Sequence, residues 1–158
     1  MGTLPNGDIQ EMGEIMNRFW GISLLAGSAL LGACASGDTT VEESAGPSSV
    51  TGEVKEWEVV VDTDTVPAGE VTFTITNNGT IEHEFLVVKT DLADGEIPVD
   101  GDHFSESLES IDVIDEIGEY AAGTTEALTV TLEAGNYQLV CNIPAHYQAG
   151  MHTAFVVE

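Results

Sequence analysis

Residues 137–152 read Tyr137-Gln-Leu-Val-Cys141-Asn-Ile-Pro-Ala-His146-Tyr-Gln-Ala-Gly-Met151-His152. The alternating pattern of residues 137–141 predicts a strand, and the apolar residues 154–157 predict a second strand after it. The connection between them carries a thiol, an imidazole and a thioether at the spacing Cys-x4-His-x4-Met. This soft, mixed donor set is typical of a mononuclear copper site that uses two imidazoles, one thiolate and a weak axial thioether.

Such a site needs a second imidazole, and His83 is the candidate that we infer. It follows a strong turn signal, Asn77-Asn78-Gly79, and it enters the apolar run Phe85-Leu86-Val87-Val88, which predicts a buried strand. Antiparallel pairing can bring the start of that strand beside Cys141. Within the loop, Pro144 restricts the backbone and Gly150 permits a tight bend before Met151.

The rest of the chain from residue 53 also favours β-structure. Apolar side chains alternate with polar ones in three further segments, at residues 57–61, 71–76 and 128–132, and turn residues separate them. Short strands with regular turn signals indicate an antiparallel sandwich or barrel. Residues 91–119 are acidic and loop-like, and the spacing of Leu108, Ile111 and Ile114 predicts a helix over residues 105–117.

Residues 141–151 resemble the metal loop of the cupredoxins, especially that of the rusticyanin and auracyanin type, and the region around His83 is similar to the family's first-ligand region. The resemblance covers roughly residues 53–158. It implies an all-β Greek-key β-sandwich, one type 1 copper ion and single-electron transfer. It also implies the ligand set, with His83 and His146 as the imidazoles, Cys141 as the thiolate and Met151 as the axial thioether.

Three residues are expected to surround the ligands: Glu84, Asn142 and Pro144. Many cupredoxins have Asn or Ser directly after the first histidine, where it ties the two ligand segments together. This chain has Glu84 instead. An ionised carboxylate so close to the thiolate is expected to lower the reduction potential.

His146 is expected to lie near the surface and to act as the electron port. Small or apolar neighbours, Pro144, Ala145, Tyr147 and Ala149, are predicted to form a docking patch around it. A patch of this kind suits the small, short-lived interfaces of redox proteins. His103, in an acidic loop, and His152, after Met151, are expected to lie outside the metal site.

Two other functions are alternatives to electron transfer. Multicopper oxidases flank the copper cysteine with histidines, whereas Val140 and Asn142 flank Cys141, and four histidines in total leave too few for further copper ions. We therefore expect no enzyme activity. Copper storage or delivery is the alternative function, although such proteins usually expose several Met or His ligands and lack a thiolate-centred set.

The N-terminus reads as a targeting segment. Arg18 precedes an apolar stretch and small residues, which is the layout of a secretory signal, and the segment ends in Leu31-Gly32-Ala33-Cys34. This resembles a bacterial lipobox, in which the cysteine is lipidated; the alternative is an ordinary signal peptide with an incidental Cys34. We predict a lipoprotein signal over residues 1–33, starting at Met1 or Met16, a flexible acidic linker over 34–52 and the copper domain over 53–158. The product would be exported and anchored to the membrane, facing the periplasm or the exterior.

The charge of the chain is extreme, with 28 Asp and Glu residues, 3 Lys and Arg residues and a formal net charge of −25. Such a surface excludes binding to nucleic acid through its phosphates, which requires basic side chains. It suits either a salt-rich environment or docking to redox proteins with basic surfaces, and both explanations remain open. We expect the protein to be a monomer.

Overall fold

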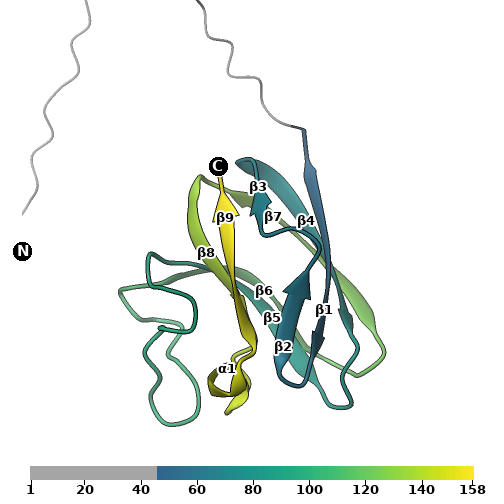
Figure 1. Cartoon of the computed structure of the whole chain (residues 1–158), viewed down its shortest axis with the longest axis vertical. Helices are drawn as coiled ribbons and strands as arrows, with labels where there is room; N and C mark the ends of the chain where they lie inside the picture. Colours follow the sequence, from purple (N-terminus) through teal and green to yellow (C-terminus); the bar gives the residue numbers. More distant parts are fainter. Residues whose placement is uncertain (1–45) are drawn as a thin grey trace, which may run out of the picture. The chain divides into compact units, whose positions relative to one another are not determined.

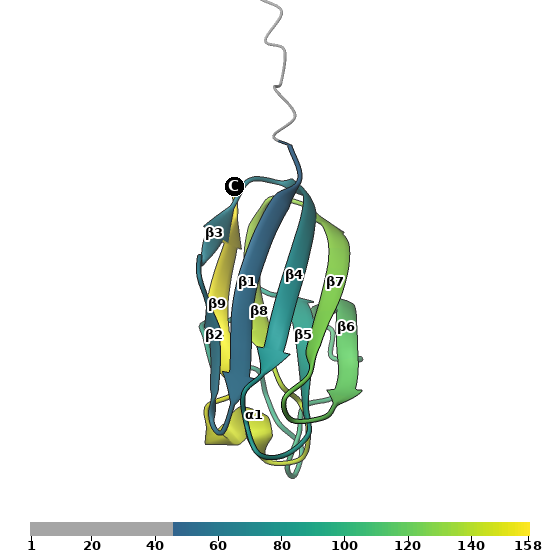
Figure 2. The same cartoon turned by 90° about the vertical axis from the view of Figure 1, so that its right-hand side faces the viewer.

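The computed structural model describes residues 46–158, which form two β-sheets packed face to face (Figures 1 and 2). The four-stranded sheet has the order β2 (Glu58–Val61), β1 (Ser48–Lys55), β4 (Gly69–Asn77), β7 (Thr125–Leu132). The five-stranded sheet has the order β3 (Thr65–Val66), β9 (His152–Val157), β8 (Gly135–Val140), β5 (His83–Lys89), β6 (Asp112–Tyr120). A single turn of helix, α1 (His146–Ala149), lies between β8 and β9. The predicted all-β Greek-key sandwich is confirmed.

The alternating pattern of β4 shows how the sequence builds this sandwich. Val71, Phe73 and Ile75 are fully buried against the other sheet. On the opposite face the hydroxyl groups of Thr72 and Thr129 share a hydrogen bond of 2.9 Å across to β7. One correction to the predicted antiparallel arrangement is needed, because β1 pairs with β4, and β3 with β9, in parallel.

The start of the domain also differs from the sequence prediction. Strand β1 begins at Ser48, inside the segment 34–52 that was predicted to be linker, and it pairs with β4 from Ser48 through Val54. Val50 and Val54 are fully buried. Polar Ser, Thr and Gly residues surround these two valines, so the segment lacks the apolar pattern that would predict a strand. The strand forms because it pairs with β4. The predicted signal segment, Cys34 and most of the linker lie outside the described residues.

The helix predicted over residues 105–117 is wrong. Its second half is part of strand β6, which pairs with β5 through two register shifts. Such irregularities break the period of two that identifies a strand. Leu108 and Ile111 lie in the loop before β6, where they pack against a hydrophobic cluster.

That cluster is the second of two hydrophobic cores, and it covers the outer face of the five-stranded sheet. The main core lies between the sheets, and there the ring of Phe73 packs against the rings of Phe85 and Phe155. The second core joins Leu86 and Val88 of β5 to side chains of the long loop between β5 and β6, visible beside the sandwich in Figure 1. Strand β5 is therefore buried on both faces, which explains its four consecutive apolar residues.

One end of the sandwich gathers the segments that matter for function. We call it the metal end; it comprises the β1–β2 turn, the β4–β5 connection and the loop that contains α1, opposite the C-terminus in Figure 1. Within residues 46–158, α1 is the only helix, and its single turn is far too short to cross a membrane.

Candidate metal centre

Two antiparallel strands bring the predicted ligands together. His83 is the first residue of β5 and Cys141 directly follows β8, and these strands pair with Leu86 opposite Val140. The start of one strand therefore meets the end of the other. The backbone N–H of Cys141 donates to the carbonyl of Met151 at 3.0 Å, which extends the β8–β9 ladder and closes the ligand loop at its base.

Inside this loop the chain turns sharply twice. Ala145 has a φ of 70° and Gly150 a φ of 117°, on either side of α1. The predicted role of Gly150 is confirmed, because this backbone conformation is rarely adopted by residues with a side chain. The N–H of Met151 donates to the carbonyl of His146 at 3.1 Å, so both ligand residues belong to one compact turn.

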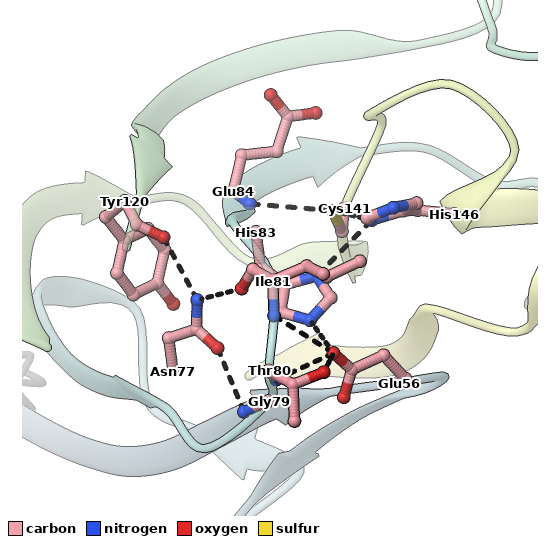
Figure 3. Close-up of polar contacts among 10 residues, drawn as sticks. All are labelled: Glu56, Asn77, Gly79, Thr80, Ile81, His83, Glu84, Tyr120, Cys141 and His146. Atoms are coloured by element: carbon pink, nitrogen blue, oxygen red, sulfur yellow. Dashed lines mark hydrogen bonds and ion pairs between the residues drawn. The ribbon is translucent and has the colours of Figure 1, made fainter. Parts of the chain in front are cut away.

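Three donor atoms converge at this point (Figure 3). Nδ1 of His146 lies 3.3 Å from Sγ of Cys141 and 3.3 Å from Nδ1 of His83. All three lie within 4.8 Å of one another. His83, Cys141 and Met151 are completely buried, and His146 is only 6% exposed.

The electrostatics of the cluster fit a bound cation. Burial raises the pKa of the Cys141 thiol to about 11 and lowers the pKa of the His83 and His146 imidazoles. Burial thus disfavours both thiolate and imidazolium, and neutral imidazole is the form that binds metals. A metal ion would replace the thiol proton and stabilise the thiolate. Two imidazole nitrogens, one sulfur and the buried thioether of Met151 form a soft donor set that suits copper.

Glu84 ties the two ligand segments together. Its backbone N–H points at Sγ of Cys141 across 3.5 Å, and its Oε1 accepts a hydrogen bond of 2.6 Å from the N–H of Asn142. Burial raises the pKa of this carboxyl to about 7. The Asn142 side chain in turn holds the β5–β6 loop, since its amide donates to the carbonyl of Phe104 and accepts from the N–H of Phe104, both at 3.0 Å.

The predicted docking patch needs one correction. Pro144, Ala145 and Ala149 are exposed at the metal end, but Tyr147 is only 3% exposed. Its ring lies in the second core, and its hydroxyl accepts from the N–H of Ile97 at 3.0 Å and donates to Gln138 at 3.2 Å. Residues 91–119 were expected to be loop-like, but nothing in the sequence indicates that this loop covers the outer face of the sheet.

Two residues at the metal end were missed in the sequence. Trp57, which the alternating pattern assigns to a strand, is 46% exposed in the β1–β2 turn. Its ring stands edge-on to the His146 imidazole, with 5.1 Å between the ring centroids. Glu56 precedes it and lies near His83. Both belong to a turn that lies 26 or more residues from any ligand in the sequence, so no local spacing could have revealed them.

The remaining histidines lie outside the donor cluster, as expected. Exposed His103 contacts Asp102 at 2.9 Å. His152 contacts Asp94, also at 2.9 Å, and its ring packs on Tyr147. Among the described residues, His83, Cys141 and His146 form the one group of potential metal ligands of this kind.

Residues 48–158 match the model of the copper-binding proteins of the plastocyanin/azurin family. The chain belongs to this family. It is a cupredoxin, with a type 1 copper site formed by His83, Cys141, His146 and Met151. Members of the family are copper-binding electron-transfer proteins.

Solved structures of several cupredoxins are similar to this one. Auracyanin from Roseiflexus castenholzii is 24% identical, with a TM-score of 0.51, and the match covers 72% of this chain and 98% of that one. Auracyanin A from Chloroflexus aurantiacus is 22% identical, with a TM-score of 0.50, and the match covers 72% and 100%. Rusticyanin from Thiobacillus ferrooxidans is 20% identical, with a TM-score of 0.51, and the match covers 73% and 79%. No curated protein sequence matches the chain.

Proposed function

We propose that this cupredoxin is an exported, lipid-anchored electron carrier that passes single electrons between redox proteins at its metal end. Copper, when bound, supplies the chemistry by gaining and losing one electron. The observation that carries the proposal is the position of His146, a ligand that is almost fully buried yet lies against the ring of exposed Trp57, in a loop whose residues Pro144, Ala145 and Ala149 are exposed. A partner that docks on these residues would approach the copper through this one imidazole.

The surface charge supports partners with basic docking surfaces. The described residues contain two lysines, and both are paired with glutamates. Lys55 lies 3.0 Å from Glu53 and 3.2 Å from Glu58, and Lys89 lies 3.0 Å from Glu133. The remaining carboxylates would steer a cationic partner, and this steering weakens as salt is added. The metal end therefore offers a small apolar contact surface, and the negative charge of the protein attracts a cationic partner from a distance.

Storage or delivery of copper fits the site less well. A donor that hands its metal to another protein needs ligands that the acceptor can reach, whereas His83, Cys141 and Met151 are completely buried. A deeply buried set favours retention of the ion. A carrier of electrons, unlike a carrier of copper, keeps its metal.

The test of this function begins with absorption and EPR spectra of the copper-loaded protein. We expect an intense visible band from the thiolate–copper bond in the wild type and its complete loss in Cys141→Ser. Electron exchange with a cationic redox protein should then slow as salt is raised, while exchange with an anionic one should accelerate. A colourless complex with Cu(I) alone would refute the electron carrier and favour storage.

The anchor is tested separately, in cells that process bacterial lipoproteins. Lipidation of Cys34 would retain the wild type in the membrane fraction, because two or three acyl chains hold a protein stably while one does so only marginally. Cys34→Ser should move the protein to the soluble exported fraction and leave its spectrum unchanged. Membrane retention of Cys34→Ser would contradict the proposed anchor.

A further inference from the structure

The connection between β4 and β5, which presents His83, is held by a carboxylate from another part of the chain. Oε1 of Glu56, in the β1–β2 turn, accepts hydrogen bonds from the N–H of Thr80 at 2.7 Å, the hydroxyl of Thr80 at 3.0 Å and the N–H of Ile81 at 3.2 Å. Figure 3 shows these contacts meeting at one oxygen. Two backbone donors that precede the first ligand are thus satisfied by a single charged side chain.

Asn77 holds the same connection from its other side. Its amide group donates to the carbonyls of Ile81 at 2.9 Å and Tyr120 at 3.0 Å, and its Oδ1 accepts from the N–H of Gly79 at 3.0 Å. These bonds fix the connection to the body of the sandwich, but they bring no charge. Glu56, in contrast, adds a negative charge beside the connection.

The ring of His83 has one nitrogen left without a partner. Its Nδ1 faces the other donors, while its Nε2 is buried and makes no hydrogen bond to any residue in the described part of the chain. Oε1 of Glu56 lies 3.8 Å from this Nε2, too far for a hydrogen bond but close enough for a strong electrostatic contact. A neutral imidazole that binds metal through Nδ1 carries its hydrogen on Nε2, so the N–H group lies beside the carboxylate.

Gly79 permits this close arrangement. A Cβ atom at Gly79 would lie 2.7 Å from Nε2 of His83 and 2.9 Å from Oε2 of Glu56, both closer than such atoms approach. A side chain at this position would have to displace the ring or the carboxylate. Glycine therefore allows the imidazole, the carboxylate and the connection to pack together.

We propose that Glu56 is a positioning residue for the first imidazole ligand. It clamps residues 80 and 81 and holds a fixed negative charge beside Nε2 of His83. The clamp sets where His83 enters the metal site. The charge favours the oxidised, more positive copper ion over the reduced one, so it lowers the reduction potential. This inference deepens the proposed electron-transfer function and rests on its copper site.

The clamp is tested first without metal. In the metal-free protein, amide hydrogen exchange at Thr80 and Ile81 should accelerate at least about tenfold in Glu56→Ala, because hydrogen bonds to a charged acceptor are lost. Glu56→Gln keeps an amide oxygen as acceptor, so exchange should stay within about threefold of the wild type. Exchange in Glu56→Ala equal to that of the wild type would overturn the clamp.

The charge is tested by the potential of the copper-loaded Glu56→Gln variant, which keeps the acceptor. Loss of the charge should reduce the preference for oxidised over reduced copper by up to about tenfold, which raises the potential by up to about 59 mV for one electron. Glu70→Gln is the matched control: Glu70 is exposed near the start of β4, seven residues from Asn77, or roughly 23 Å along the strand. That separation exceeds the screening length of about 8 Å at physiological salt.

The two readouts separate the possible failures. A potential that shifts no more in Glu56→Gln than in Glu70→Gln would overturn the electrostatic role. Failure of the wild type to form the coloured copper complex would refute the proposed function, whereas amide exchange in the metal-free protein would still decide the clamp. An unchanged spectrum together with a raised potential in Glu56→Gln would support both parts of the inference.

Discussion

Oε1 of Glu84 accepts a hydrogen bond of 2.6 Å from the backbone N–H of Asn142, which follows the ligand Cys141. The link joins the start of β5 to the ligand loop. A glutamate here meets the same structural need as the Asn or Ser of related proteins, because its longer side chain still reaches the loop. The difference lies in its ability to carry a charge.

The first prediction concerns this link. Glu84→Ala leaves the N–H of Asn142 without its acceptor, and an unsatisfied buried donor costs about 1–3 kcal/mol. We expect a loss of that size in the free energy of unfolding of the metal-free protein, measured in urea. Glu84→Gln keeps an acceptor and should lose less than half as much.

Glu119→Ala is the control for Glu84→Ala, because it also removes a glutamate side chain, and Glu119 is exposed on β6 and makes no hydrogen bond to the ligand loop in the described part of the chain. Its free energy of unfolding should change by less than about 0.5 kcal/mol. Equal effects of Glu84→Ala and Glu119→Ala would show that the loss of a carboxyl group in this region, not the link to Asn142, explains the result.

The second prediction separates the exposed end from the core beneath it. Trp57→Ala removes an exposed ring that contacts His146, so electron exchange with a redox protein should slow severalfold, as expected from the loss of about 1 kcal/mol of docking energy. Tyr147→Phe removes a buried hydroxyl with two partners and should cost about 1–2 kcal/mol of stability. The rate of electron exchange of Tyr147→Phe should equal that of the wild type. If electron exchange were slow in Tyr147→Phe and normal in Trp57→Ala, the partner would not dock at Trp57.

The third prediction concerns the effect of pH on a contact far from the ligands. Asp62 accepts hydrogen bonds from the hydroxyl of Thr51 at 2.6 Å and from its N–H at 3.0 Å, which lowers the pKa of this carboxyl from its ordinary value of 3.8. A lowered pKa in the folded state means that ionised Asp62 stabilises the fold above pH 3.8, and that this contribution is lost as the pH falls through the folded-state pKa. Asp62→Asn should therefore be less stable than the wild type at neutral pH.

The measurement for Asp62 is a series of urea titrations from neutral pH to below pH 3, on metal-free wild type and Asp62→Asn. The difference between the two midpoints should shrink only in the acidic part of the series. A constant difference over the whole range would show that the charge of Asp62 plays no part. Asp64→Asn serves as the comparison, since Asp64 is an exposed neighbour in the same connection.

A feature of this molecule can be predicted from the sequence when the residues that form it lie close together along the chain. Cys141, His146 and Met151 lie within eleven residues, so their spacing alone indicated the donor set. Strands such as β4 are predictable because one of their faces is buried and the other is partly exposed. His83 required the resemblance to cupredoxins as well, since only the pairing of β5 with β8 brings it to Cys141.

The features that were missed depend on contacts across the fold. Tyr147 was placed on the surface because the sequence gives no sign that the loop with Ile97 and Phe104 covers the outer face of the second sheet. The early start of β1 depends on its pairing with β4, and the irregular register of β6 imitates a helical pattern. Glu56 is one acid among 28, and only the fold distinguishes it from the others.

The last prediction concerns the left-handed turn that opens α1. Ala145 has a φ of 70°, a conformation that costs residues with a Cβ atom roughly 1–2 kcal/mol, whereas Ala149 ends the helical turn with ordinary geometry. Glycine relieves the strain at position 145, but the flexible unfolded chain offsets roughly half of that gain. Ala145→Gly should thus stabilise the metal-free protein by about 0.5 kcal/mol, and Ala149→Gly should destabilise it by about 0.5–1 kcal/mol. Urea unfolding of both variants checks the opposite signs, and destabilisation by both would show that the N–H of Ala145, which donates to the carbonyl of Asp102 at 2.6 Å, requires the stiffer residue.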